Sequence, residues 1–389
     1  MNQPWYAAVA MAAGTDQFIG RDILDGQFRI LEKIGSGGMG SVYKASQPSM
    51  NRTVAVKILH PKLTNRRDLV SRFRREASAM SHLNHPNTVK VFNYGEIEDG
   101  SLFIVMEFLE GRNLHQTVRT EGPMLYRRAL PILIQVCAAL GEAHSKGIIH
   151  RDLKPENIFL CKDPLGKEDY AKVLDFGLAK VTEREMNPGS IVLTQEGMIF
   201  GTPEFMSPEQ AQGKPLDPSS DIYSLAAILY EAITGKLPFN AKTAMEFIQH
   251  HVTSKPIDLN ARVHGLSFPV DLAAALAKAM AKKPADRFRT AEEFANALRE
   301  VLTNAGIDPN AGGSNEPVHA VVEKMPTAVP QAPLVAPSRS YVPLVIGVAV
   351  GGLVLGILVT ILVVVLLFPD KPPERHQNRA VPPVERVQF

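Results

Sequence analysis

The stretch H-R-D-L-K-P-E-N at residues 150–157, followed by D-F-G at 175–177, decides the fold of this chain. A helical pattern that ends near Ser145 and a glycine at position 147 precede the first segment. The apolar pair Val173-Leu174 directly precedes the second segment. Either short motif could arise by chance, so segments nearer the N-terminus determine how the two are interpreted.

A glycine-rich turn, G-S-G-G-M-G-S-V at residues 35–42, follows a predicted strand at 28–34. Glycines in such a turn let backbone N–H groups approach phosphate oxygens, because no Cβ stands in the way. The same spacing occurs in dinucleotide-binding folds, where a helix follows the turn. Here the strand-like segment V-Y-K-A at 42–45 follows, so the pattern favours a phosphate-binding turn between two strands.

Lys57 ends the apolar segment V-A-V-K at residues 54–57. A charged side chain inside an apolar strand is costly unless it meets an anion. A helix predicted from about Asp68 to Ser81 carries Glu76 on the same face as its apolar residues. Glu76 either points inward to pair with Lys57 or lies at the edge of the apolar stripe, and the pattern favours neither.

Taken in this order, the four segments resemble the signature motifs of the protein kinase family. The resemblance covers residues 28–302 and includes every main motif of the family. It implies an α+β, two-lobed kinase fold, with a β-rich N-lobe to about Phe108 and a helical C-lobe to about Leu302. The wording of the motifs is similar to that of the eukaryotic-like serine/threonine kinases of bacteria.

The resemblance also implies roles for four polar residues. Asp152 would accept or orient the proton of the attacking substrate hydroxyl, and Lys154 would neutralise charge on the transferring γ-phosphoryl group. Asn157 and Asp175 would hold the magnesium ions, because oxygen donors suit Mg²⁺. Little covalent chemistry is then asked of the protein, so positioning and electrostatics would carry the rate.

By the same resemblance, the kinase domain would bind ATP. Lys57, held by Glu76, would clamp the α- and β-phosphates, and Met106 would line the back of the adenine pocket. The backbones of Glu107 and Leu109 would bond the adenine. The nucleotide-binding residues implied in this way are Ile34, Gly35, Ser36, Gly37, Gly38, Met39, Gly40, Val42, Ala55, Lys57, Glu76, Glu107 and Leu109.

The class of acceptor follows from two positions. Lys154 in D-L-K-P-E-N and Thr202 in G-T-P-E are similar to serine/threonine kinases, so protein substrates with serine or threonine acceptors are expected. The rival hypothesis is a catalytically inactive pseudokinase that serves as a membrane scaffold. Retention of Lys57, Asp152 and the two magnesium-binding residues favours the active kinase.

The segment 175–209 is similar to a kinase activation segment. In the family, an arginine in the position of Arg151 often pairs with a phosphorylated residue of this segment, because phosphate adds charge and strong acceptors. The predicted phosphorylation sites are Thr194, Ser190 and Thr182. The resemblance further implies a buried pair of Glu209 with Arg287 and an Asp221 that braces the catalytic loop.

Composition divides the chain into five parts. They are a loose N-terminal extension at 1–27, the kinase domain at 28–302, a proline-rich disordered linker at 303–340, a transmembrane helix at 342–368 and a short tail at 369–389. The linker cannot bury enough apolar surface to offset its ordering entropy. The run at 342–368 has no charged residue and exceeds the roughly 20 apolar residues that cross a bilayer.

Catalysis needs ATP, so we expect a single-pass membrane protein with a cytoplasmic kinase domain and the tail on the opposite side. The lysines and arginines that flank the helix favour the reverse orientation, which we weigh less than the need for ATP. Two G-x-x-x-G spacings, at 347–351 and 352–356, make a homodimer possible. The net charge of +2 gives no indication of nucleic-acid binding, and the two cysteines are expected to be reduced.

Overall fold

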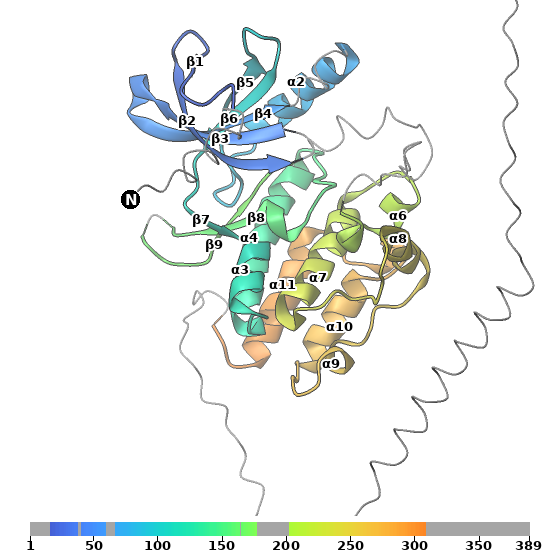
Figure 1. Ribbon diagram of the computed structural model, residues 1–389. Helices are drawn as coiled ribbons and strands as arrows, with labels where there is room; N and C mark the ends of the chain where they lie inside the picture. The colour runs from blue at the N-terminus through green and yellow to red at the C-terminus, as the bar shows by residue number, and fades with distance from the viewer. Residues whose placement is uncertain (1–15, 38–39, 60–66, 164, 177–201, 309–389) are drawn as a thin grey trace, which may run out of the picture. The chain divides into compact units, whose positions relative to one another are not determined.

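The computed structural model describes residues 16–37, 40–59, 67–163, 165–176 and 202–308 (Figure 1). The chain divides into two compact units, Met1–Pro317 and Val318–Phe389, and every described residue belongs to the first. Figure 1 shows a β-sheet lobe in blue and a helical lobe in green to orange. The predicted two-lobed α+β fold is therefore confirmed.

The N-lobe is built on an antiparallel sheet whose strands follow the order β1-β2-β3-β4-β6-β5. The strands are β1 (Asp22–Ile23), β2 (Phe28–Gly37), β3 (Gly40–Gln47), β4 (Arg52–Leu59), β5 (Val91–Glu96) and β6 (Leu102–Glu107). Strands β4 and β6 are central and almost wholly buried, which explains their continuous apolar sequences. Helix α2 (Arg67–Ser81) contacts β5 and buries Phe73, Ala77 and Met80.

The prediction of a loose extension at residues 1–27 is wrong for its second half. Strand β1 pairs with β2, and both Phe18 and Ile23 are buried in the N-lobe core. The Asp16 carboxylate accepts a hydrogen bond from the Tyr43 hydroxyl at 3.0 Å and pairs with Lys33 at 3.2 Å. The segment was misread because its apolar residues are few and widely spaced, and only contacts with β2 and β3 give them a core to join.

A second, three-stranded sheet brings the site motifs next to the hinge that follows β6. Strands β7 (Gly111–Asn113), β8 (Ile158–Cys161) and β9 (Tyr170–Val173) pair antiparallel. Strand β8 directly follows the 3₁₀ turn η3 (Pro155–Asn157), and Leu174 alone separates β9 from the D-F-G segment. Pairing of β8 with β9 therefore places the ends of the two decisive motifs side by side.

The C-lobe is helical and is organised around the buried helix α7. Its longer helices are α3 (Leu114–Glu121), α4 (Tyr126–Ser145), α7 (Pro218–Thr234), α8 (Ala244–Thr253), α10 (Val270–Ala279) and α11 (Ala291–Asn304). Short helices α6 (Pro208–Ala211) and α9 (Leu259–Arg262) and the turns η4 (Pro203–Phe205) and η5 (Pro284–Asp286) complete it. Helix α7 begins at an Asp217 cap, ends at Gly235 in the left-handed conformation and packs against α4, α10 and α11.

Several predicted features lie outside the described residues. They are Gly38, Met39, the phosphorylation sites Thr182, Ser190 and Thr194, most of the linker, the apolar run at 342–368 and the tail. Among the described residues, no helix has the length and apolar character needed to cross a membrane.

Candidate active site

The catalytic-loop residues predicted from the sequence lie within one tight turn. The Lys154 ammonium lies 2.8 Å from a carboxylate oxygen of Asp152. The Asn157 side-chain amide donates to the backbone carbonyl of Asp152 at 2.8 Å, and the Asn157 carbonyl accepts from the N–H of Leu174 at 2.9 Å. The turn thus holds an acceptor for a proton, a positive charge and an amide oxygen next to the D-F-G segment.

Asp221, near the start of α7, fixes the backbone of this loop through its carboxylate. Its two carboxylate oxygens accept the backbone N–H groups of His150 at 2.8 Å and Arg151 at 3.0 Å, and the imidazole of His144 lies at 2.8 Å. Burial would raise the pKa of Asp221, but the hydrogen bond and charge of His144 and the remaining contacts hold it below its usual value. The predicted bracing by Asp221 is confirmed.

His150 is a packing residue, as predicted. It is fully buried, its ring lies 4.8 Å from that of Phe176, and its Nε2 donates to the carbonyl of Leu174 at 2.8 Å. Arg151 follows with a φ of 68°. This left-handed conformation is strained for a residue other than glycine. The two bonds to Asp221 on either side of His150 Cα hold the backbone in it.

On the N-lobe side, Lys57 pairs directly with the aspartate of D-F-G. Its ammonium is 2.7 Å from Asp175 Oδ2, and only 8% of Lys57 is exposed. Burial raises the pKa of Asp175, but the charge and hydrogen bond of Lys57 outweigh this and lower the pKa overall. Asp175 therefore stays ionised. It is the anion that a lysine inside an apolar strand was predicted to need.

The expected ion pair between Lys57 and Glu76 is not among the ion pairs of the described residues. Glu76 lies on α2 between the buried Phe73 and Met80, so its inward-facing position agrees with the periodicity. Lys57 instead reaches Asp175, beyond the end of β9. The contribution of Glu76 to nucleotide binding remains a prediction.

The residues predicted for magnesium fit that ion by their chemistry. The Asn157 amide nitrogen is committed to Asp152, so its oxygen faces away from that bond, and Asp175 uses one oxygen for Lys57. Within the described part of the chain, no group of three or more His, Cys, Asp or Glu residues could hold a metal alone. Magnesium typically takes one or two protein ligands and completes its shell with phosphates and water, which this pair of oxygens suits.

The glycine-rich turn joins β2 and β3 as a hairpin in which Gly37 lies opposite Gly40. A Cβ on Gly40 would lie 2.2 Å from the carbonyl oxygen of Ile58, so only glycine fits there. In the β3–β4 register Val42 lies opposite Lys57, and in the β4–β6 register Ala55 lies opposite Met106. The predicted phosphate and adenine contacts therefore fall on neighbouring strands of the sheet.

Glu107, the last residue of β6, connects this strand to two other segments through its side chain. Its carboxylate accepts the backbone N–H of Lys90 and the ammonium of Lys172, each at 2.7 Å. Lys172 lies on β9, so this contact joins the end of β6 to the three-stranded sheet. The sequence predicted a backbone role for Glu107 and gave no indication of this side-chain contact, because Lys172 lies 65 residues away.

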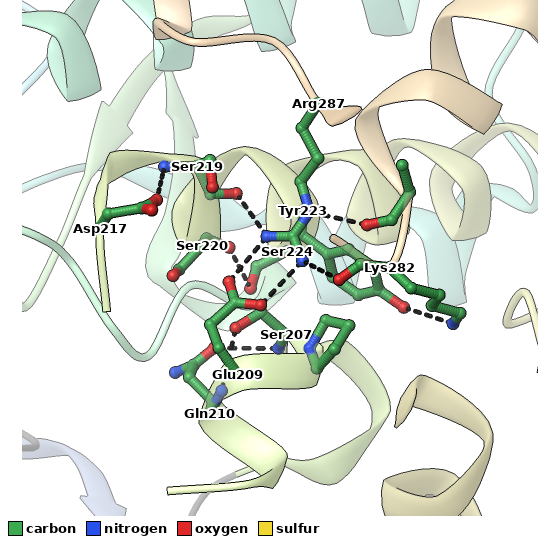
Figure 2. Close-up of polar contacts among 12 residues, drawn as sticks. Ser207, Glu209, Gln210, Asp217, Ser219, Ser220, Tyr223, Ser224, Lys282 and Arg287 are labelled. Atoms are coloured by element: carbon green, nitrogen blue, oxygen red, sulfur yellow. Dashed lines mark hydrogen bonds and ion pairs between the residues drawn. The ribbon is translucent and has the colours of Figure 1, made fainter. Parts of the chain in front are cut away.

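Below the catalytic loop, Glu209 and Arg287 form the predicted buried pair, shown in Figure 2. Two parallel hydrogen bonds of 2.7 Å join the guanidinium to the carboxylate. Arg287 also donates to the carbonyls of Ala281, Ser219 and Lys282. The pair is thus fully hydrogen-bonded, which a buried ion pair needs if it is to be tolerated.

Two supporting residues were missed in the sequence. His144, on α4, contacts Asp221, and the Gln210 side chain donates to the carbonyl of Arg151 at 2.5 Å. Gln210 also completes a capping box with Ser207 at the start of α6 (Figure 2). The spacing of serine and glutamine at 207 and 210 could have indicated the cap, but no local signal indicates either contact with the catalytic loop.

The two lobes, the hairpin glycines, the Lys57–Asp175 pair and the braced catalytic loop define the catalytic domain of a phosphotransferase. The family model described as "Protein kinase domain" matches residues 28–298, and the chain belongs to this family. Its kinase domain is of the serine/threonine class, which the similar curated proteins below share.

The chain is 43% identical over 288 residues to the serine/threonine-protein kinase pkn3 of Myxococcus xanthus, with 74% of this chain and 52% of that protein covered. It is 41% identical to the serine/threonine-protein kinase PknB of Mycobacterium tuberculosis, covering 70% of this chain and 42% of PknB. The crystal structure of the M. tuberculosis PknI kinase domain superposes with a TM-score of 0.56 at 26% identity, covering 72% of this chain and 98% of that one. The chain spans about half the length, or less, of these curated relatives.

Proposed function

We propose that the protein transfers the γ-phosphoryl group of ATP to serine and threonine hydroxyls of proteins, including those of its own activation segment. The observation that carries this proposal is the turn in which Asp152, Lys154 and Asn157 lie together, braced by Asp221 and adjoining Asp175. A scaffold that had lost catalysis would need none of these groups in this arrangement.

Each side chain of the turn has a distinct task. The Asp152 carboxylate accepts the hydrogen bond of the acceptor hydroxyl and orients it for attack on the γ-phosphorus. The Lys154 ammonium, 2.8 Å from Asp152, lies where it can balance the negative charge that moves between the two reacting oxygens. Asn157 and Asp175 would hold magnesium, which supplies positive charge to the phosphates when bound.

On the other side of the cleft, Lys57 binds the phosphates. It comes from the central strand β4, and its ion pair with Asp175 aims the ammonium toward the magnesium-binding end of the site. On the flanking strands, Gly37 and Gly40 carry no Cβ that would keep phosphate oxygens away from the backbone. Glu76 can then take Lys57 as partner once α2 shifts, which would release Asp175 for the metal.

We also propose that the kinase domain is cytoplasmic and tethered by a helix at 342–368, with the tail on the other side of the membrane. The support for this is the uncharged run of residues at 342–368 and the requirement for ATP. The two G-x-x-x-G spacings would allow two such helices to approach closely, which favours a homodimer that phosphorylates in trans.

The test is transfer of labelled γ-phosphate from MgATP by the full chain in mild detergent, beside an Asp152→Asn control. Phosphoserine and phosphothreonine should form in the wild type and vanish in the control, and phosphosite mapping should find Thr194, Ser190 or Thr182. Nucleotide binding without any transfer would favour the pseudokinase scaffold instead. Alkaline extraction of membranes that carry the chain would remove it if no segment is inserted.

A further inference from the structure

A chain of polar contacts runs through the C-lobe core from Lys282 to the turn η4. The Lys282 ammonium lies 3.3 Å from the Tyr223 hydroxyl, which lies 2.9 Å from His251 Nδ1. His251 Nε2 lies 3.0 Å from the carbonyl oxygen of Glu204 in η4. Tyr223 and His251 are completely buried and come from helices α7 and α8, while Lys282 lies beyond α10 (Figure 2 shows Tyr223 and Lys282).

The groups at the two ends of this row of contacts, the Lys282 ammonium and the Glu204 carbonyl, determine which atom donates in each hydrogen bond. A carbonyl oxygen only accepts, so His251 Nε2 must carry a proton. Burial, followed by the charge of Lys282, lowers the pKa of His251 to about 3, so the ring is neutral and Nδ1 accepts. Tyr223 therefore donates to His251, and its hydroxyl oxygen accepts from Lys282, which leaves no polar atom of the chain mismatched.

The turn that receives these contacts packs against the C-lobe core through Pro203 and Phe205, which are both buried. Within residues 202–206 the backbone hydrogen bonds are 3.2 Å from Phe205 to Thr202 and 3.4 Å from Met206 to Pro203, both long. The bond from His251 is shorter than either and comes from a fully buried donor. Pro203 and Phe205 anchor the turn on either side, and the bond from His251 fixes the backbone carbonyl of Glu204 between them.

The same turn borders the catalytic loop. Gln210, just beyond it, donates to the carbonyl of Arg151, next to Asp152. The Glu204 carboxylate and that of Glu156, four residues after Asp152, both act on Glu231, whose pKa burial and these charges raise to about 7. Glu204 and Glu156 therefore lie near the same buried carboxyl group, which places residues 202–206 beside the Glu156 end of the catalytic loop.

We infer that His251 is a positioning residue for the protein substrate: through its bond to Glu204 it holds residues 202–206 in the shape that receives the acceptor chain. This inference rests on the proposed phosphotransferase function. It assigns a role in acceptor binding to a side chain that lies outside both the nucleotide site and the catalytic loop. ATP binding, which uses the other lobe and Asp175, does not depend on it.

The test compares His251→Phe with His251→Gln in the full chain in detergent, with dephosphorylated casein as acceptor. Phenylalanine fills the space without a donor, whereas the glutamine amide can still donate to Glu204. The KM for casein should rise about five- to tenfold in His251→Phe, since a buried carbonyl loses its hydrogen bond, and should return to within about twofold in His251→Gln. KM for ATP and ATP hydrolysis without casein should stay within about twofold in both variants.

Equal changes in the casein and ATP parameters, or a wild-type KM for casein in His251→Phe, would overturn the assignment. Tyr223→Phe, which retains the ring and removes only the donor to His251, supplies the result if His251→Phe does not fold. It should raise KM for casein in the same direction by about two- to threefold, and no change would count against the chain of contacts. A wild-type chain that transfers no phosphate at all would instead refute the proposed function.

Discussion

The two sides of the active site differ in how firmly they are held. On the C-lobe side, the catalytic loop is fixed by Asp221 and Gln210, and the Glu209–Arg287 pair beneath it is buried and fully hydrogen-bonded. On the N-lobe side, Lys57 has a single ion-pair partner among the described residues, Asp175, and Ile34 beside the glycine turn is 47% exposed. Among the described residues, the catalytic loop is thus held by more polar contacts than Lys57 on the opposite lobe.

The difference predicts that C-lobe substitutions will act mainly on stability. Arg287→Ala should have the largest effect, because it leaves the Glu209 carboxylate buried without its cation and should lower the free energy of unfolding by about 3–5 kcal/mol. Urea unfolding followed by circular dichroism measures this. Arg289→Ala, which removes an exposed arginine two residues away, serves as the control and should change stability by less than about 0.5 kcal/mol.

Asp221→Asn should come next. An amide can accept only one of the two backbone N–H groups of His150 and Arg151, and its NH₂ group would face the other, so we expect a loss of about 2–3 kcal/mol. Activity should fall further than stability explains, because the strained backbone at Arg151 is released beside Asp152. Unfolding curves and initial rates of phosphate transfer, with the exposed Asp286→Asn as control, test both points; a fully active variant would show that the brace is dispensable.

The free energy of unfolding should depend on pH through Glu231, which interacts with the carboxylates of Glu156 and Glu204. The pKa of Glu231 is raised from 4.5 to about 7, by burial first and then by Glu156 and Glu204. Between these pH values the unfolded chain has released a proton that the folded chain retains, so the Glu231 contribution to stability falls as pH rises. Glu231→Gln should remove this fall, gaining about 1–2 kcal/mol over wild type at pH 8 and little at pH 4.5. Parallel stability curves for the two proteins would contradict it.

Lys57→Met should have the smallest effect on stability and a large effect on catalysis. It leaves Asp175 without its cation, but the Asp175 side chain is 30% exposed and keeps access to water, so we expect a smaller loss than at Arg287, under about 1 kcal/mol. The rate of phosphate transfer should drop by at least about 100-fold, because no other described cation takes its place at the phosphates. Thermal unfolding and transfer assays beside Lys90→Met, which changes an exposed lysine, separate the two effects. A Lys57→Met variant that loses stability in proportion to its activity would contradict the proposed difference between the two lobes.

The sequence predicted best those features that short motifs encode. The β-strand after the glycine turn was predicted correctly from the strand-like segment at 42–45, which lies in β3. The catalytic turn lies within one motif, whereas the brace at Asp221 and the Glu209–Arg287 pair were implied by the family resemblance. The last two join residues 71 and 78 positions apart, so only the resemblance to a known family could indicate them.

What the sequence could not predict depends on contacts between distant residues. His144 and His251 each occur in helices where a lone histidine gives no signal, and their partners Asp221 and Glu204 lie 77 and 47 residues away. The choice of Lys57 between Glu76 and Asp175 likewise depends on how α2 lies against the sheet, which no periodicity fixes. Burial and tertiary geometry decided these cases.

The short strand β1 has a practical consequence for anyone who trims this protein for crystallography or inhibitor screening. Cutting at Phe28, where the family match begins, would remove Phe18 and Ile23 from the N-lobe core and uncover one side of β2. A sheet edge bared in this way is a template for pairing with a second molecule, and the shortened protein would tend to aggregate. A recombinant fragment should therefore start ahead of Asp16, so that the Tyr43 hydroxyl retains its acceptor and the sheet its natural border.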